Sequence, residues 1–360
     1  MKSSHVIKLE SSRQCSLIVG EGIIEHLDEH FDFSGYSSIV LVTDTNVHRL
    51  YGRSVLATLR ATGQKVSFFT LPTGERAKSL STVERGYKFL LANKVDRKGL
   101  ICALGGGVVG DTAGFIAASY LRGIDYLQLP TTLLAQVDSS LGGKVGVNFE
   151  GKKNMVGSFY QPAAIIADVA LLRSLPPAEM RHGLAEVIKY AIAMDEGIYR
   201  ILERKEDSVF STAELKDIVL RCCRLKADVI EVDETEKTGQ RAILNFGHTV
   251  AHALEAEAGF KGNHGEAVAV GIIAAARMSQ RLGILKTDDV ERIKKLIAKF
   301  GLPIACAGVN PNRLINATRF DKKTTSGQTR WVLVEGIGQG IAGQAVAEET
   351  VRKVLEELSR

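Results

Sequence analysis

A carboxylate and two imidazoles in the second half of the sequence are side chains that divalent metals prefer. Glu186 lies in the helical segment HGLAEVIKYA, with Lys189 one turn later on the same face. His248 and His252 are four residues apart on another helical segment, and His264 stands where a loop leads into a helix. One oxygen ligand, two nitrogen ligands and an open position form the set of a catalytic zinc. Ordinary core or surface histidines and a helical ion pair would give the same pattern, so both interpretations stay open.

A glycine-rich turn in the first half has the spacing of a dinucleotide-binding loop. GGGVVGD, residues 105–111, follows an apolar run and opens a helical segment, and its glycines fit the pattern G-x-G-x-x-G. Such a turn lets backbone N–H groups approach a pyrophosphate at a helix N-terminus, although a tight structural turn has the same spacing. Asp44 ends an earlier apolar run, where it would contact a ribose or cap a helix. TGERAK, residues 73–78, follows the next run as a ligand loop or a solvated loop.

Lysines gather in the segment 138–154, DSSLGGKVGVNFEGKKN, which we expect to be irregular. It is not a Walker A loop, because Lys144 is not followed by Ser or Thr. Such lysines hold phosphate or carboxylate as point charges, alone or with Arg122, although each one singly also suits an exposed surface. With a dinucleotide turn and a metal site, these cations predict metal-assisted oxidation of a phosphorylated or carboxylated sugar by NAD.

The elements that must position these residues alternate in the first half of the chain. Several runs are almost continuously apolar, as strands covered on both faces are: 38–44, 65–71, 100–104, 125–130 and 163–169. Residues 80–91 have helical periodicity, with Ser81 and Glu84 as a capping box. This alternation predicts an α/β, doubly wound, Rossmann-like N-terminal domain over residues 1–177.

Helical segments dominate the second half and predict a mostly α-helical C-terminal domain over residues 178–360. The expected helices are 178–194, 213–232, 249–258, 267–282, 287–300 and a final one from Glu348. A short alternating run, 330–334, surrounds the single tryptophan. Metal and substrate would bind to this domain, and the cofactor to the first.

Composition argues against several classes of protein. The 46 basic and 41 acidic residues give a net charge of +5 without a basic stripe, so we expect no nucleic-acid partner. The longest uncharged apolar run, 267–276, is far shorter than the roughly 18 residues that cross a bilayer, so we expect no membrane partner. The start lacks the apolar core of a signal peptide, and none of the five cysteines forms a C-x-x-C pair. A cytoplasmic location is the prediction.

Longer strings resemble a known family. GGGVVGDTAGF, LPTTLLAQVDSSLGGKVGVN, GKKNMVGSFYQP, GLAEVIKY, RAILNFGHT and NHGEAVAVG, in this order, resemble the 3-dehydroquinate synthases, which are sugar phosphate cyclases. The resemblance covers nearly the whole chain. It implies a lyase of the shikimate pathway that converts 3-deoxy-D-arabino-heptulosonate 7-phosphate into 3-dehydroquinate and phosphate. It also implies recycled NAD, Zn²⁺ or Co²⁺ as the metal, and a homodimer.

The resemblance further implies roles for individual residues. The implied metal ligands are Glu186, His248 and His264. The implied NAD-binding residues are Asp44, Asn46, Thr73, Gly74, Glu75, Lys78, Gly106, Gly107, Val108, Val109, Gly110, Asp111, Thr131, Thr132, Leu171, Leu172, Arg173 and Ser174. The substrate would contact Arg122, Lys144, Asn154, Lys226, Arg241, Asn245, Lys322 and Lys323. The implied catalytic residues are Lys153, Lys189, Asp138 and His252, the last as a proton handler.

One segment departs from the family pattern. The segment 233–241, DETEKTGQR, is one residue longer than usual. The acidic proton acceptor of the family would therefore correspond to Glu236, or would be missing because Lys237 stands at its position.

Three other functions compete with this one. Another sugar phosphate cyclase activity, on a heptulose or hexose phosphate, would use the same residues. A polyol dehydrogenase would accumulate NADH and would not need so many cations around its substrate. A non-catalytic binding module would not need a complete ligand set.

Overall fold

The chain folds into two compact units in the computed structural model. The structure describes residues 3–8, 14–207, 209–257, 262–319, 324–325 and 328–360. The first unit comprises Met1–Pro176 with Ser211–Thr235, and the second comprises Pro177–Phe210 with Glu236–Arg360. The sequence suggests two continuous domains, whereas in the structure residues 211–235 group with the first unit.

The first unit is built on a seven-stranded sheet. Its strands are β1 (Ser3–Lys8), β2 (Gln14–Gly20), β3 (Ser38–Asp44), β4 (Lys65–Leu71), β5 (Gly99–Gly105), β6 (Asp125–Pro130) and β9 (Ala164–Asp168). Their order across the sheet is β1-β2-β9-β6-β5-β3-β4. All neighbouring pairs are parallel except β1 and β2, which are antiparallel. The five strands expected from apolar runs are all present.

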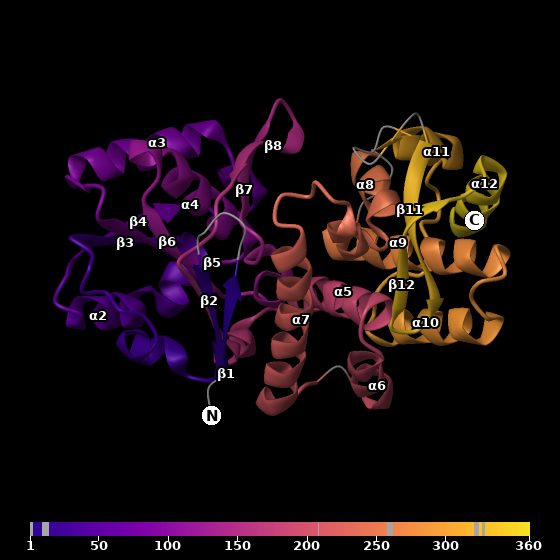
Figure 1. The fold of residues 1–360 in the computed structure, drawn as a ribbon, viewed down its shortest axis with the longest axis horizontal. Coiled ribbons are helices and arrows are strands. Elements are labelled where there is room, and N and C mark those ends of the chain that lie inside the picture. The colour runs from indigo at the N-terminus through magenta and orange to yellow at the C-terminus, as the bar shows by residue number, and fades with distance from the viewer. Residues whose placement is uncertain (1–2, 9–13, 208, 258–261, 320–323, 326–327) are drawn as a thin grey trace. The chain divides into compact units, whose positions relative to one another are not determined.

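Helices cover both faces of this sheet, as Figure 1 shows. The α-helices are α1 (Thr45–Val47), α2 (Arg53–Ala61), α3 (Leu80–Ala92), α4 (Gly107–Ser119) and α7 (Thr212–Val232). Shorter 3₁₀ or π segments are η1 (Ile23–Glu29), η2 (His48–Gly52), η3 (Glu75–Ala77), η4 (Tyr120–Arg122), η5 (Ala135–Ser139) and η6 (Val169–Ser174). Val40 and Val42 of β3 pack with α3 and α4, whereas Ile39 and Leu41 pack with α2 and η1. This alternation follows from the two-residue period of a strand and confirms the doubly wound fold.

Two local predictions in the first unit are wrong. The segment 138–154 is not irregular throughout, because β7 (Lys144–Phe149) and β8 (Lys152–Phe159) form an antiparallel hairpin. Glu150 and Gly151 both have positive φ, as a two-residue hairpin turn of type I′ requires. The capping box also fails, because Ser79 caps α3 by accepting from the Thr82 N–H, and Glu84 instead pairs with a lysine one turn later.

The second unit is mostly helical. Its helices are α5 (Pro177–Ala193), α6 (Glu196–Arg204), α8 (His248–Ala256), α9 (His264–Arg281), α10 (Thr287–Lys299), α11 (Pro311–Arg319) and α12 (Glu348–Leu358), with a 3₁₀ segment η7 (Gln240–Asn245). A small sheet contains β10 (Thr324–Thr325), β11 (Gln328–Gly336) and β12 (Gln339–Ala345). Helix α9 contacts α5, α8, α10, α12 and β11, so it is the centre of the unit. It is buried almost all round, which explains why its apolar run 267–276 is uninterrupted.

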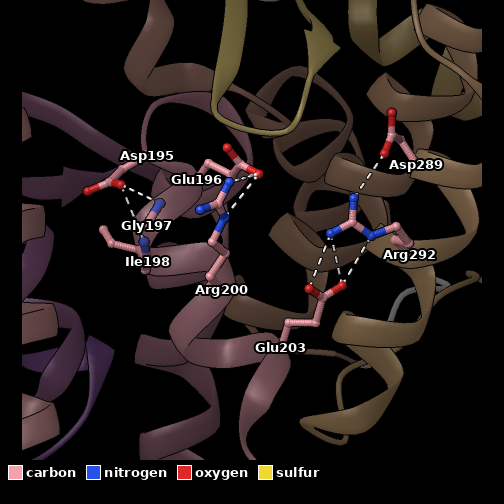
Figure 2. Close-up of polar contacts among 8 residues, drawn as sticks. All are labelled: Asp195, Glu196, Gly197, Ile198, Arg200, Glu203, Asp289 and Arg292. Carbon is pink, nitrogen blue, oxygen red and sulfur yellow. Dashed lines mark hydrogen bonds and ion pairs between the residues drawn. The ribbon is translucent and has the colours of Figure 1, made fainter.

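Polar contacts at the surface of this unit connect α6 with α10 (Figure 2). Asp195 caps α6 by accepting from the N–H groups of Gly197 and Ile198. Arg292 on α10 donates to both carboxylate oxygens of Glu203 on α6, at 3.0 and 3.2 Å. None of the helices in the described part of the chain has the length and apolar character needed to span a bilayer.

Candidate metal and cofactor sites

Three side chains from different helices of the second unit converge. Glu186 comes from α5, His248 from the start of α8 and His264 from the start of α9. Nε2 of His248 lies 3.4 Å from Oε1 of Glu186, and Nε2 of His264 lies 3.3 Å from the same oxygen. One ligand atom from each residue lies within 4.8 Å of the other two. The candidate metal ligands, 62 and 16 residues apart in sequence, are therefore brought together.

Glycines bring the three helices close enough for this contact. A Cβ on Gly265 would lie 2.7 Å from the His182 Cα, so the start of α9 approaches the α5 backbone one turn before Glu186. Gly247, with φ of 77°, precedes α8, and a Cβ on Gly271 would lie 2.0 Å from the Gly247 carbonyl oxygen. Only glycine tolerates these distances. The close backbone contacts therefore fix the positions of the N-termini of α8 and α9, where His248 and His264 lie.

The donor set fits a divalent metal. Tetrahedral zinc with ligands at about 2.0–2.1 Å has ligand atoms about 3.3 Å apart, which is the separation of the Glu186 oxygen from both imidazole nitrogens. Nδ1 of His248 lies 3.2 Å from the Phe246 carbonyl oxygen, and Nδ1 of His264 lies 3.3 Å from Oε2 of Glu255. These acceptors would take the proton on Nδ1 when a metal occupies Nε2, as imidazole ligands of metals require. The expected ligand set of Glu186, His248 and His264 therefore passes this test.

Burial and neighbouring charges shift the pKa of all three side chains. Burial alone would raise the pKa of Glu186, but the Lys189 ammonium and His248 hold it well below its usual range. Burial lowers the pKa of His248. Burial would lower the pKa of His264 as well, but hydrogen bonds to Glu186 and Glu255 raise it to about 10. The carboxylates of Glu186 and Glu255 therefore stabilise positive charge on the His264 ring.

Two expected catalytic residues border the metal cluster. Nζ of Lys189 lies 2.5 Å from Oε2 of Glu186, and both side chains are buried. The rings of His248 and His252 meet edge to face with centroids 5.6 Å apart, and His252 is exposed. Lys189 therefore contacts a candidate metal ligand directly, and His252 lies between a ligand and solvent.

The dinucleotide turn of the first unit has the expected setting. GGGVVGD connects β5 to α4, and Gly106 is the N-cap of α4. A Cβ on Gly110 would lie 2.7 Å from Oε1 of Gln128 on β6, so this glycine lets the helix pack closely on the sheet. The turn therefore exposes the N-terminus of a 13-residue helix at the carboxyl end of a central strand, which is where α/β domains bind phosphate groups.

Three of the cofactor candidates belong to one hydrogen-bonded network. The buried Lys78 ammonium donates to Asp111 and to Asn154. Asn148 on β7 donates to Glu75 at 2.7 Å and accepts from the Asn154 N–H at 2.9 Å. Burial raises the pKa of Asp111, and the Lys78 ammonium opposes that shift. The network connects the hairpin to the loop after β4.

The network contains one residue that the sequence analysis did not select and one that it assigned to the substrate rather than to the cofactor. Asn148 was not among the candidates, and a single asparagine in a glycine-rich segment gives no signal of its own. Asn154 was expected at the substrate, and the structure places it beside the cofactor candidate Lys78.

The other cofactor candidates lie at the same carboxyl edge or in the core beneath it. Oδ1 of Asp44 caps α1 by accepting from Asn46 and Val47, so the helix-cap interpretation is correct and involves one carboxylate oxygen. The remaining candidates lie in loops or turns after strands: Thr73, Gly74, Thr131, Thr132, Leu171, Leu172, Arg173 and Ser174. Of these, Leu171 and Leu172 are buried, and Arg173 donates to Glu21 at the surface.

The substrate candidates fall into several separate groups. Nζ of Lys226 on α7 lies 2.8 Å from Oδ1 of Asp138 in η5, so these two candidates form a pair within the first unit. Arg122 lies in the turn before β6, at the end of the sheet opposite the dinucleotide turn. Lys144 and Lys153 are exposed on the hairpin.

The remaining substrate candidates lie in or near the second unit's 3₁₀ segment. Nε of the buried Arg241 is 3.6 Å from Oε1 of Glu236, and Asn245 ends η7. This contact places Glu236 beside a substrate candidate, and the acidic role in this segment stays a prediction. Lys322 and Lys323 lie outside the described residues.

Solved structures with this fold include two synthases with cofactors in place. A 2-deoxy-scyllo-inosose synthase complexed with carbaglucose-6-phosphate, NAD⁺ and Co²⁺ is 26% identical, with 99% of both chains covered and a TM-score of 0.87. A 2-epi-5-epi-valiolone synthase from Streptomyces hygroscopicus with NAD⁺ and Zn²⁺ bound is 25% identical, with 96% of both chains covered and a TM-score of 0.87. The chain therefore shares its fold, over nearly its whole length, with a class of synthases whose two members named here were solved with NAD⁺ and a divalent metal.

Sequence comparison narrows this class to a family. The 3-dehydroquinate synthase N-terminal model matches residues 68–182, and the C-terminal model matches residues 183–324. The 3-dehydroquinate synthase of Desulforamulus reducens is 45% identical over 323 residues, which are 89% of this chain and 90% of that protein. The chain belongs to the 3-dehydroquinate synthase family, which confirms the resemblance of its motifs.

Proposed function

We propose that this protein is a 3-dehydroquinate synthase that depends on NAD and on Zn²⁺ or Co²⁺. Its substrate is 3-deoxy-D-arabino-heptulosonate 7-phosphate, and its products are 3-dehydroquinate and phosphate. The observation that carries the proposal is the convergence of Glu186, His248 and His264 in a chain of this family. Relatives with bound NAD⁺ and Co²⁺ or Zn²⁺ support the choice of cofactors.

The chain would hold its cofactors with separate sets of residues. Glu186, His248 and His264 would ligate the metal, while the N-terminus of α4 and the network around Lys78 would bind the dinucleotide. When bound, the dinucleotide would supply a reversible hydride acceptor for the substrate hydroxyl carbon, and the divalent cation would supply a Lewis acid for the hydroxyl oxygen. Neither cofactor is consumed.

Polar side chains of the protein would bind and orient the substrate. Oxidation at C5 acidifies the neighbouring proton, so that phosphate leaves by elimination, with a substrate phosphate oxygen as the base. Lys144, Lys153, Lys226 and Arg241 would hold the phosphate and carboxylate by charge-assisted hydrogen bonds. Asp138, which pairs with Lys226, would contact the reacting hydroxyls. Ring opening and an intramolecular aldol reaction then need mainly a pocket that selects one conformer.

Phosphate release and cofactor absorbance together test the proposal. The full chain would be incubated with the heptulosonate phosphate, NAD⁺ and Zn²⁺, and free phosphate and NADH would be followed over many turnovers. We expect continuous phosphate release with no net NADH, loss of release after a chelator, and recovery when metal is added. NADH accumulation without phosphate release would show a dehydrogenase instead.

A second cyclase activity is the closest alternative. The similarity to a synthase complexed with carbaglucose-6-phosphate supports a hexose phosphate substrate. The higher identity to a 3-dehydroquinate synthase, 45% against 26%, favours the heptulosonate phosphate. Release of phosphate from glucose 6-phosphate but not from the heptulosonate phosphate would reverse this choice.

The proposal includes a homodimer and a cytoplasmic location. The family resemblance is the support for the dimer, and the cysteine pattern is the support for the location. We propose no nucleic-acid or membrane partner. Sedimentation of the purified protein would check the dimer, and fractionation of the source cells would check the location.

A further inference from the structure

A carboxylate outside the expected ligand set contacts the metal cluster of the second unit. Glu255 lies on α8, seven residues after His248, and its Oε2 is 3.3 Å from Nδ1 of His264. Its side chain is only 15% exposed. Because α9 supplies His264, this contact joins the end of α8 to the beginning of α9.

The contact gives His264 an acceptor for the proton on Nδ1 when a metal occupies Nε2. An ionised carboxylate only accepts hydrogen bonds, so Glu255 stabilises the form of the imidazole that is protonated at Nδ1. In that form the lone pair is on Nε2, the atom that lies 3.3 Å from Oε1 of Glu186. His248 has a different arrangement, because its Nδ1 faces the Phe246 carbonyl oxygen. The two histidines thus have acceptors of unequal strength, one charged and one neutral.

Charge gives Glu255 a second effect. Lys189 places an ammonium 2.5 Å from Oε2 of Glu186, which neutralises the one carboxylate among the expected ligands and repels an incoming cation. Glu255 adds a second negative charge to the cluster, in contact with His264. The carboxylates of Glu186 and Glu255 and the ammonium of Lys189 together carry a net charge of −1, which favours a divalent cation.

We propose that Glu255 is a positioning residue for the metal site: it orients His264 with Nε2 as the ligand atom and offsets the charge of Lys189. This inference rests on the metal site of the proposed function. Glu255 acts through His264 and is not itself a ligand.

Cobalt binding by the metal-free full-length protein tests the proposal without an activity assay. Affinity would be measured by competition with a chromophoric chelator, and the ligand geometry by the visible absorption of bound Co²⁺. The variants are Glu255→Ala, which removes the acceptor and its charge, and Glu255→Gln, which keeps a neutral acceptor. Glu257→Gln is the matched control, because Glu257 is similarly buried, at 13% exposed, but pairs with Arg313.

We expect Glu255→Ala to weaken cobalt binding about 10- to 100-fold and to alter the absorption spectrum. Glu255→Gln should have an intermediate affinity with a spectrum close to that of wild type, and Glu257→Gln should match wild type in both. Thermal melting of the metal-free proteins would show whether each variant folds. Should Glu255→Ala misfold, the Gln variant still reports the charge effect.

Three results would contradict the inference. Wild-type affinity and spectrum in both Glu255 variants would show that the contact does not position His264. Equal weakening in Glu257→Gln would show a general effect on the end of α8. A wild-type protein that binds no cobalt would overturn the metal site as well, and so separates failure of the proposed function from failure of the Glu255 role.

Discussion

Replacing Lys189 by methionine should expose the cost of a buried charge next to the metal cluster. The Lys189 ammonium and the Glu186 carboxylate are 2.5 Å apart, and their side chains are 2% and 0% exposed. Methionine keeps much of the side-chain volume but leaves the carboxylate without this cation. Breaking a buried ion pair by removing one partner costs about 3–5 kcal/mol.

This cost converts into a measurable change in melting temperature. The second unit has about 160 residues, and a unit of that size loses about 2–4 °C per kcal/mol. The metal-free Lys189→Met protein should therefore show a transition about 6–20 °C below that of wild type. Added Zn²⁺ should stabilise the variant more than wild type, because a cation at Oε1 provides positive charge to the same carboxylate.

Calorimetry of metal-free and metal-saturated proteins is the assay. Lys294→Met is the control, because Lys294 pairs with Glu291 on the surface of α10 at 3.9 Å, and its loss should change stability by less than about 0.5 kcal/mol. An unchanged transition in metal-free Lys189→Met would refute the buried-pair argument. Equal stabilisation of variant and wild type by Zn²⁺ would show that the metal and Lys189 do not share the Glu186 carboxylate.

Three further results are expected. His264→Ala should abolish phosphate release through loss of metal but keep NAD⁺ binding in a fluorescence titration, because the cofactor candidates lie in the other unit; full activity of a metal-free variant would contradict this. Lys144→Ala should weaken the heptulosonate phosphate about 10- to 100-fold by removing a charge-assisted hydrogen bond, with a smaller effect on NAD⁺; equal effects on both ligands would reassign Lys144. The five buried cysteines should not react with a thiol reagent at about pH 8 until the protein is denatured. Only the thiolate reacts, and burial raises the pKa of both Cys15 and Cys223 to about 12. Rapid labelling of the native protein would be inconsistent with this burial.

Hydrophobic patterning was sufficient to predict five strands of the first unit's sheet, but not β1 and β2. The central strands are buried on both faces, so residues 39–42 of β3 are all apolar. The hairpin gave no comparable signal, because Gly146 and Gly157 face each other across β7 and β8 and weaken the strand pattern. A Cβ on Gly157 would lie 2.2 Å from the Val145 carbonyl oxygen, so backbone packing rather than β-propensity determines the residue.

The chemistry of the metal site was readable from the sequence, but its convergence was not. A glutamate and two histidines on three helical segments suggest a metal, yet only the family resemblance selected Glu186, His248 and His264 over His252. The approach of Gly265 to α5 brings the ligands together, and no pattern in the sequence reports such a contact.

Two further features differ in how far the sequence reports them. Glu255 was detectable in principle, because it follows His248 and His252 at helical spacing on the same face. The grouping of residues 211–235 with the first unit was not detectable, because the sequence of an amphipathic helix does not specify which element it packs against. Helix α7 contacts β1, β2, η5 and η6, and these contacts bring Lys226 to Asp138.

Anomalous X-ray scattering at the cobalt edge tests the central claim most directly. Crystals of the protein grown with Co²⁺ should show one strong peak, about 2.0–2.2 Å from Oε1 of Glu186 and from Nε2 of both His248 and His264. A peak at other residues, or none near these three side chains in a cobalt-saturated crystal, would contradict the account.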